Sequence, residues 1–136
     1  MQDQPPRIGA LHSISFEVEN SQTITFSCAA EISVLSTPSL IWFLEQAALQ
    51  FLLPWLDEKS ISVGTHVDVE HLAPTPVGAT VNCTAQLIFH DGPVYRFKVE
   101  AYAGDEKIAK GLHSRRIIQA SQLARRLQAL ETKSRK

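Results

Sequence analysis

The stretch TPSLIWFLEQAALQFLLPWL, from Thr37 to Leu56, decides the fold of this 136-residue chain. Thr37 and the residue before it, Ser36, are of the type that caps helices. Pro38 suits the first helical position, where its missing N–H has no intrahelical partner. Pro54 ends or kinks a helix. The sequence therefore predicts one long helix over residues 38–53, apolar on nearly every side, and such a helix is normally surrounded by other parts of the protein.

A membrane span is the alternative reading of this stretch. The predicted helix would be about 24 Å long at roughly 1.5 Å per residue, whereas a bilayer core needs about 20 mostly apolar residues. Glu45, Gln46, Gln50 and Pro54 also interrupt the run. A helix buried inside a soluble domain fits better, so no membrane contact is expected.

Segments with the two-residue period of β-strands flank the helix on both sides. Apolar residues alternate from His12 to Val18, and the sequence favours pairing of Thr23–Ser27 with that strand. After the helix, Asp91-Gly92 and Gly104-Asp105 mark turns between further strands. Three predicted strands show alternation: Ile61–Val69; the strand with Val81, Cys83, Ala85, Leu87 and Phe89 on one face; and the strand with Tyr95, Phe97, Val99 and Ala101 on one face. A less regular strand at Lys107–Gln119 and a helix at Ala120–Glu131 follow.

This order of elements predicts an α+β fold in which an antiparallel sheet wraps around one long central helix. Residues 1–136 fit a single domain, with a C-terminal helix and basic tail over residues 120–136. One sheet covers only one side of an apolar helix. A second copy of the chain could cover the rest, so we expect at least a homodimer.

Composition excludes some classes of function. With 44% apolar and 20% charged residues and a net charge of −1, nothing attracts the chain to nucleic acid or to an anionic membrane. Cys28 and Cys83 lack metal or CxxC spacing, which indicates free core thiols in a reducing compartment. The start MQDQPPRIGA does not resemble a signal peptide. We therefore expect a cytoplasmic protein.

Glu45 is the only charged residue between Thr37 and Leu56. A carboxylate in such apolar surroundings costs free energy unless it is paired or protonated. The alternative is a helix-surface glutamate whose carboxylate reaches water. If the carboxylate is buried and paired, Glu45 is a candidate functional group.

Strand parity nominates a partner for this carboxylate. In a regular strand, His71 would share the inward parity of Val69, whereas His66 would point away from the helix. A β-bulge near Glu70 would reverse that choice. The two predicted faces of this strand are Ile61, Val63, Val67 and Val69 toward the helix, and Ser62, Gly64, His66 and Asp68 away from it.

Thr37, Glu45 and His71 together form a plausible hydrolytic set. The histidine could act as a general base or acid, the carboxylate could orient it or activate water, and the helix N-terminus offers N–H groups to an oxyanion. Each residue also has a structural alternative. Thr37 could be a simple N-cap, and an inward histidine is often a hydrogen-bonded core residue.

Three segments resemble one enzyme family. VLSTPSLIWFLEQAA (Val34–Ala48), SVGTHVDVEHLAPTPVGATV (Ser62–Val81) and KIAKGLHSRRII (Lys107–Ile118) are similar to the fluoroacetyl-CoA-thioesterase-like branch of the hotdog-fold thioesterases. The resemblance implies a hotdog fold, a dimer at minimum, and hydrolysis of acyl-CoA thioesters without a separate cofactor. It places the catalytic residues at Thr37, Glu45 and His71.

The resemblance also suggests residues that bind substrate. It implies that backbone at Gly64 approaches the thioester carbonyl, as a residue without Cβ permits. Arg115 and Arg116 could each contact a phosphate of CoA, although a solvated strand charge is an equal alternative. No Phe occurs between Cys28 and Leu35, where the fluoroacetyl-specific enzyme has aromatic lid residues. We therefore expect a general short-to-medium acyl group instead of fluoroacetyl.

Two other functions remain open at this stage. A hotdog fold can host an enoyl-CoA hydratase, although the Asp/His motif of those enzymes is not found here. The pocket could also bind acyl thioesters or other apolar ligands without turning them over. For the thioesterase, the sequence does not decide whether the nucleophile is water or Thr37.

Overall fold

The computed structural model describes residues 4–27 and 31–134. Within these residues the chain forms seven strands and two α-helices, with short 3-10 turns at Asn20–Gln22 and Leu53–Trp55. The elements are β1 (Leu11–Glu17), β2 (Thr23–Ser27), β3 (Glu31–Leu35), α1 (Thr37–Leu52), β4 (Ser60–His71), β5 (Thr80–Asp91), β6 (Val94–Ala103), β7 (Glu106–Gln119) and α2 (Ala120–Ser134).

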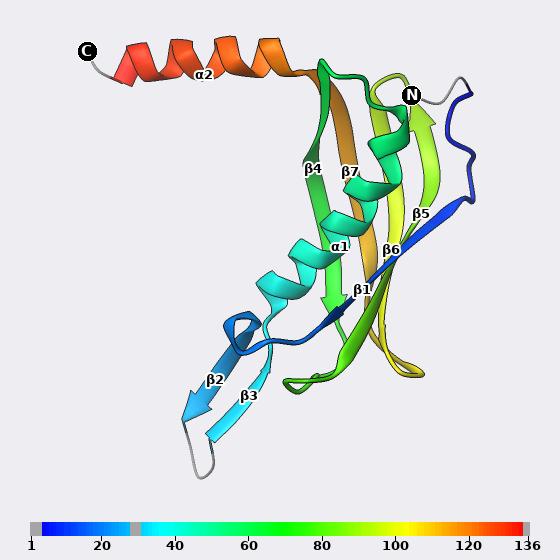
Figure 1. Cartoon of the computed structure of the whole chain (residues 1–136), viewed down its shortest axis with the longest axis vertical. Coiled ribbons are helices and arrows are strands. Elements are labelled where there is room, and N and C mark those ends of the chain that lie inside the picture. The colour runs from blue at the N-terminus through cyan, green and yellow to red at the C-terminus, as the bar shows by residue number, and fades with distance from the viewer. Residues whose placement is uncertain (1–3, 28–30, 135–136) are drawn as a thin grey trace.

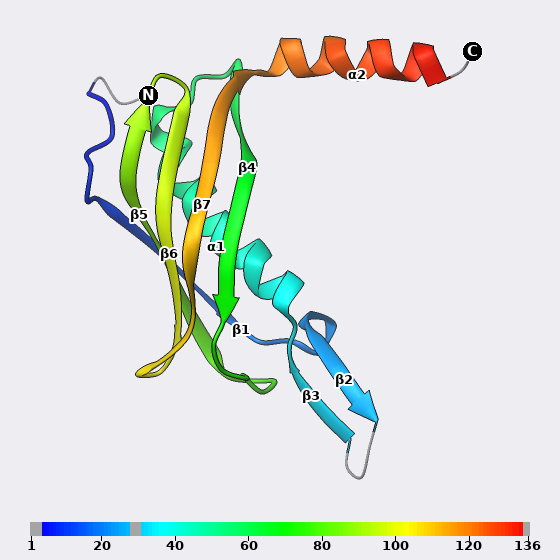
Figure 2. The same cartoon turned by 180° about the vertical axis from the view of Figure 1, so that it is seen from behind.

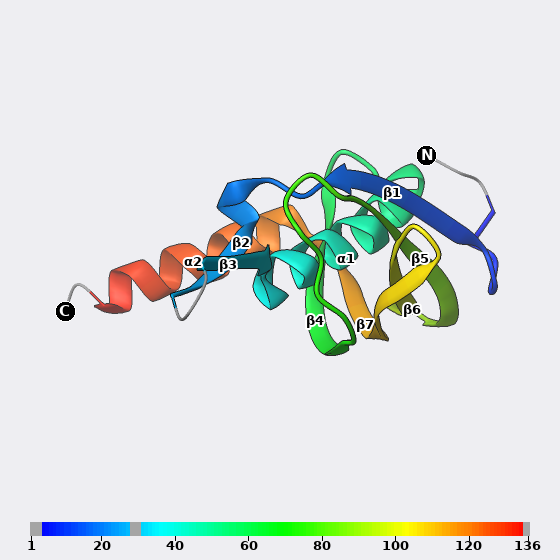
Figure 3. The same ribbon diagram turned by 90° about the horizontal axis from the view of Figure 1, so that it is seen from below.

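Five strands form one antiparallel sheet in the order β1-β5-β6-β7-β4. Figure 1 shows α1 lying across one face of this sheet, and the view from below shows the sheet curving around the helix (Figure 3). The predicted α+β architecture is confirmed. Because β4 and β1 are the edges of the sheet, the curved sheet encloses α1 from one side only.

Helix α1 buries one face and leaves another open. Ser36 caps it by accepting a hydrogen bond from Ser39 N–H at 3.3 Å, and Pro54 lies in the 3-10 turn that follows its last residue. Trp42, in contrast, is 55% exposed. The buried face consists of Leu40, Leu44, Ala47, Ala48, Phe51 and Leu52, which pack against core residues of β5 and β6 such as Leu87, Phe97 and Val99.

The predicted pairing of Thr23–Ser27 with the first strand is wrong. β2 pairs with β3, a strand that the sequence did not reveal, and β1 pairs with β5. The chain leaves β1 through the 3-10 turn Asn20–Gln22, which is closed by reciprocal hydrogen bonds between Glu19 and Gln22 instead of a hairpin turn. The β2–β3 ribbon therefore extends past the N-terminal end of α1 (Figures 1 and 2).

The predicted faces of β4 are wrong before residue 65, because the strand contains a β-bulge. Gly64 pairs with Arg115 but His66 pairs with Ser114, so Thr65 is an extra residue. An extra residue inverts the alternation. Before the bulge, Ser62 and Gly64 therefore face the helix, and Ser62 is buried. Beyond the bulge, Val69 and His71 keep the inward parity that was predicted.

A second bulge lies in β5. Val81, Cys83, Ala85 and Leu87 are buried as predicted, but Phe89 is exposed because the register shifts between it and Leu87. Burial raises the pKa of the Cys83 thiol to about 12, so this cysteine is an inert core residue. Cys28 lies outside the described residues.

Helix α2 begins where predicted and projects away from the sheet, at the end of the molecule opposite the β2–β3 ribbon (Figures 1 and 2). None of the helices within residues 4–27 and 31–134 is long and apolar enough to cross a membrane.

Candidate active site

Thr37 and His71 meet at the N-terminal end of α1. The Thr37 Oγ1 atom lies 2.8 Å from Nδ1 of His71, within hydrogen-bond distance. Thr37 is the first residue of the helix and His71 is the last residue of β4. The two side chains are 34 positions apart in sequence, so only the fold brings a hydroxyl and an imidazole together here.

The local sequence leaves the Thr37 hydroxyl available for this contact. Ser36, not Thr37, is the N-cap residue, so the serine side chain satisfies the end of the helix. The simple N-cap alternative for Thr37 is therefore not what the structure shows. On the other side of the pair, Nε2 of His71 is buried and has no hydrogen-bond partner among the described residues.

The first turn of α1 offers a single backbone donor beside this pair. The first three N–H positions of a helix have no intrahelical partner. Pro38 has no N–H, and the N–H of Ser39 is bonded to Ser36. Of these three positions, Thr37 thus retains a backbone N–H that can face a negatively charged oxygen, at the positive end of the helix dipole.

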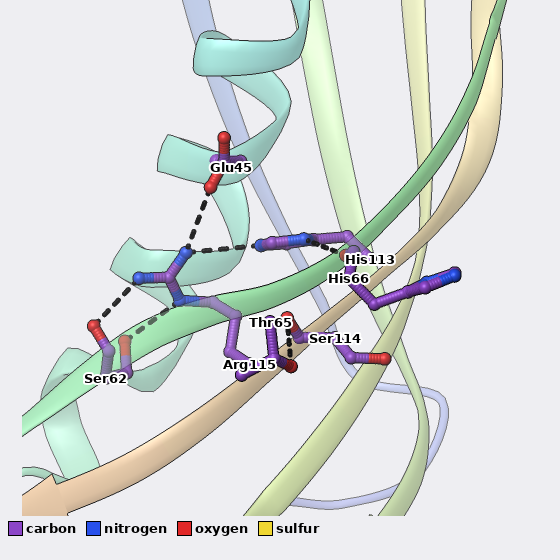
Figure 4. Close-up of polar contacts among 7 residues, drawn as sticks. All are labelled: Glu45, Ser62, Thr65, His66, His113, Ser114 and Arg115. Carbon is purple, nitrogen blue, oxygen red and sulfur yellow. Dashed lines mark hydrogen bonds and ion pairs between the residues drawn. The ribbon is translucent and has the colours of Figure 1, made fainter.

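Glu45 lies in a second polar cluster, in the middle of α1 (Figure 4). Its Oε2 atom is 3.7 Å from Nη1 of Arg115, which is an ion-pair distance, and its side chain is 33% exposed. The carboxylate is thus paired, as its apolar surroundings require, but it also reaches solvent. Both readings of Glu45 made from the sequence hold in part.

Arg115 is buried, with 4% of its surface exposed, and its guanidinium is fixed by several acceptors. Its Nε donates to Ser62 Oγ at 3.0 Å, and Nη2 donates to the Ser62 carbonyl at 2.9 Å. The remaining nitrogen, Nη1, lies between Glu45 and His113. Burial lowers the pKa of Arg115 while the Glu45 carboxylate raises it.

His113 completes this cluster from β7. Its Nδ1 lies 2.8 Å from the carbonyl oxygen of His66, and its Nε2 lies 3.2 Å from Nη1 of Arg115. A carbonyl only accepts, so Nδ1 carries the proton and Nε2 accepts from the guanidinium. Burial is the main cause that lowers the pKa of His113, and the charge of Arg115 adds to it.

Gly64 leaves room for this cluster because it has no side chain. A Cβ added to Gly64 would lie 2.7 Å from Oε2 of Glu45, 3.2 Å from Cε1 of His113 and 3.4 Å from Nη1 of Arg115. The space that the missing side chain leaves is therefore occupied by the Glu45 carboxylate. The bulge at Thr65 explains why Gly64, predicted to face away, lies here.

The three predicted catalytic residues thus fall into two groups. Thr37 and His71 are in contact, whereas Glu45 contacts Arg115 and Gly64. Glu45 lies eight positions after Thr37 in the helix, which corresponds to about 12 Å along the helix axis. Both groups lie along α1, so a ligand bound beside this helix could touch both.

The two arginines predicted to bind CoA have different environments. Arg115 is enclosed, and its guanidinium contacts Ser62, Glu45 and His113. The expected contacts of Arg115 and Arg116 with CoA phosphates stay predictions. Arg116 is exposed, next to Arg115 on β7.

Ser62 and His113 were not singled out from the sequence. A signal existed in the segment LHSRR, where four polar residues follow one another in a strand.

No group of three or more His, Cys, Asp or Glu side chains within residues 4–27 and 31–134 is arranged to hold a metal ion.

Comparison with known proteins identifies the family. The model of the fluoroacetyl-CoA-specific thioesterase family matches residues 18–121, most of the chain. The chain belongs to this family. The match includes Thr37, Glu45, Gly64 and His71, and it confirms the family predicted from the sequence.

Relatives of known sequence and structure agree. The fluoroacetyl-CoA thioesterase of Streptantibioticus cattleyicolor is 34% identical over 85 residues, which span 62% of this chain and 61% of that protein. A crystal structure of a mutant fluoroacetyl-CoA-specific thioesterase in complex with fluoroacetate and CoA is 29% identical, with a TM-score of 0.80 over 87% of this chain and 99% of the other. A Thermus thermophilus member of the thioesterase superfamily, 22% identical, has the same fold, with a TM-score of 0.88 over 97% of this chain and 98% of the other. The predicted hotdog fold is thereby confirmed.

Proposed function

We propose that this protein is an acyl-CoA thioesterase, which hydrolyses a thioester to a free acid and CoA. The observation that carries the proposal is the hydrogen bond between Thr37 and His71 at the N-terminal end of α1. It joins a hydroxyl to a base in the geometry of an activated nucleophile. Membership of a family of thioester hydrolases supports the same reaction.

The chemistry follows from this pair. The oxygen of Thr37, or of a water beside it, attacks the carbonyl carbon of the thioester while His71 takes the proton. The tetrahedral intermediate then collapses, the carbon–sulfur bond breaks, and the CoA sulfur leaves with the proton that His71 returns. If Thr37 is the nucleophile, one water then hydrolyses the acyl-threonine by the same sequence of proton transfers and releases the free acid.

The remaining groups stabilise charge. The backbone N–H of Thr37 lies at the positive end of α1 and would donate to the oxyanion that forms on the carbonyl oxygen. Arg115 holds the Glu45 carboxylate in place through their ion pair, so a substrate bound along α1 would meet this carboxylate as well as the Thr37–His71 pair. We assign no metal or separate cofactor to the reaction, because these side chains and water account for each proton.

We also propose that the working form is a homodimer in the cytoplasm. Trp42 of α1 and Leu53, which follows the helix, are exposed, and β4 is an edge strand of the sheet. Exposed large apolar side chains and an unpaired strand edge are typical of surfaces that a partner covers. The unpartnered Nε2 of His71 is consistent with a site that a second copy or a substrate completes.

The proposal is tested by hydrolysis of a panel of acyl-CoAs, from acetyl to palmitoyl with phenylacetyl and fluoroacetyl, monitored by the release of free thiol. Wild type, Glu45→Gln and a control, Glu58→Gln, are compared. Glu58 is an exposed carboxylate outside the cluster. We expect hydrolysis by wild type and the control and its loss in Glu45→Gln. Tight binding without hydrolysis of any member would show a binding protein, and hydration of crotonyl-CoA would show a hydratase.

A further inference from the structure

A hollow of about 350 Å³ lies beside Thr37 and His71, between the β2–β3 ribbon and the segment that follows β4. Of the described residues that line it, only these two carry polar side chains. The others are aliphatic or aromatic: Ile24, Phe26, Val34, Leu35, Leu72, Ala73 and Pro74. This "ribbon hollow" therefore has the predicted reactive pair at one end and apolar walls elsewhere.

The ribbon presents an apolar face to this hollow. Thr25 and Ser33, on the opposite face of the ribbon, are hydrogen-bonded to each other at 2.7 Å. Ile24 and Phe26 are 48% and 51% exposed, which leaves much of two large apolar side chains in contact with water. Covering such surface is favourable by roughly 25 cal/mol for each Å². A ligand with an apolar body would gain that free energy here.

We infer that the ribbon hollow binds the acyl group of the substrate, and that this group is a hydrocarbon chain of several carbons instead of a two-carbon acyl group. The inference rests on the proposed function. A thioester whose carbonyl carbon is attacked beside Thr37 and His71 has its acyl group on one side and its CoA sulfur on the other. The apolar hollow next to that pair suits the acyl group, because no Lys or Arg among the described residues lines it to pair with CoA phosphates.

The size and chemistry of the hollow favour a longer chain. Its volume is at the lower end of the range for ligand pockets, roughly 300–1,000 Å³, and a two-carbon group would leave most of the apolar wall uncovered. A larger hollow, of about 510 Å³, is unsuited to this role, because Asp68, Lys98 and Lys110 are among its lining residues. Those residues lie on the face of the sheet away from α1.

The inference predicts a dependence on chain length. Each methylene that enters an apolar site contributes about a fourfold gain in affinity, until the site is full. We therefore expect kcat/KM to rise from acetyl-CoA through the medium chains, and then to level off. Ile24→Ser and Phe26→Ser should flatten this rise, because they should lower kcat/KM for the longer chains more than for acetyl-CoA. Both side chains are half exposed, so neither change empties the core.

The experiment measures kcat/KM for straight-chain acyl-CoAs of two to twelve carbons and for fluoroacetyl-CoA. It compares wild type, the two ribbon variants and Ile88→Ser, an exposed isoleucine of β5 that does not line the hollow. A rise with chain length that is lost in the ribbon variants and kept in the control supports the inference. A preference of wild type for acetyl- or fluoroacetyl-CoA, or an equal effect of the ribbon variants on every substrate, overturns it.

Two further outcomes distinguish a failed acyl site from a failed thioesterase. If wild type hydrolyses nothing, the proposed function fails, and the acyl site is then tested by calorimetric binding of the same acyl-CoAs. Affinity that rises with chain length and falls in Ile24→Ser still supports an acyl site. Affinity that is independent of chain length overturns it. If sedimentation shows that Ile24→Ser dissociates an oligomer, the ribbon face is covered by a second copy and the inference is overturned.

Discussion

Nε2 of His113 accepts a hydrogen bond from Nη1 of Arg115 at 3.2 Å. The opposite ring nitrogen donates to the backbone carbonyl at the β4 bulge, so the imidazole is neutral in this arrangement. A proton on Nε2 would place one N–H donor against another, and it would place the positive imidazolium of His113 beside the positive guanidinium of Arg115. The geometry around Glu45 therefore requires His113 to stay deprotonated.

This requirement makes stability depend on pH. Burial lowers the pKa of His113 in the folded protein below the ordinary value of 6.5, so the unfolded chain binds the proton more readily. Stability is then complete above about pH 6.5 and falls as the pH is lowered from there toward the folded-state pKa. We expect urea unfolding of wild type to show this loss between pH 7 and pH 5. His113→Gln should be less stable at pH 7 and should lose less on acidification. Equal losses in the two proteins would exclude His113 as the cause.

Replacing Arg115 should cost stability as well as activity. Lysine keeps the charge but cannot reach both acceptors of Ser62 and also lie between His113 and Glu45. Buried acceptors left without a donor cost about 1–3 kcal/mol, so Arg115→Lys should lower the free energy of unfolding by that amount and reduce kcat. The neighbouring exposed residue is the matched control. Arg116→Lys should leave stability within about 0.5 kcal/mol of wild type.

An effect of Arg116→Gln on KM for acyl-CoA, with kcat unchanged, would place Arg116 on the CoA phosphates. If Arg115→Lys is as stable and active as wild type, then the fixed geometry of the guanidinium has no consequence for the site.

Two glycines of the sheet should respond differently to alanine. At Gly64 the added Cβ meets the free end of the Glu45 side chain, which can move, so the fold should persist while the carboxylate is displaced. At Gly111 the added Cβ would clash with the backbone oxygen of Asp68, which cannot move without breaking the β4–β7 pairing. We expect Gly64→Ala to melt near wild type with a much reduced kcat, and Gly111→Ala to fold poorly. A fully active Gly64→Ala enzyme would contradict the role given to Glu45.

The sequence was sufficient for the elements that depend on local pattern. The long helix followed from its capping residues and Pro54, and the inward faces of β5 and β6 followed from alternation up to Leu87. Bulges were not readable, because one inserted residue changes the face of a strand without changing its composition. That is why Gly64 was assigned to the wrong face by parity, while His71 was assigned to the correct one.

The partner of Glu45 was also beyond the sequence. A carboxylate within an apolar run signals that a counter-charge exists, but Arg115 is 70 positions away on β7, and only the packing of α1 against the sheet brings it near. The contact between Thr37 and His71 was anticipated as a functional set, and the structure shows it as a hydrogen bond. The separation of Glu45 from Thr37 along the helix follows from the sequence alone, whereas the pairing of Glu45 with Arg115 instead of His71 does not.

The separate roles of Ser36 and Thr37 allow a direct test of the proposed chemistry. Ser36 caps α1 and Thr37 bonds His71, so substitutions at the two residues should have separate effects. Ser36→Ala should cost about 1 kcal/mol of stability through loss of the cap and leave kcat nearly unchanged. Thr37→Val, which has almost the same shape, should retain stability and lower kcat by about 10²–10⁴, as should His71→Ala.

Thr37→Ser retains a hydroxyl and should restore most of the activity that Thr37→Val loses. Rapid-quench mass spectrometry of wild type then identifies the nucleophile, because an acyl group on Thr37 adds a defined mass to the peptide that contains it. If no adduct appears while the loss in Thr37→Val persists, the hydroxyl positions a water for His71. If Thr37→Val hydrolyses acyl-CoA at the wild-type rate, neither role holds, and the reaction must be centred on Glu45.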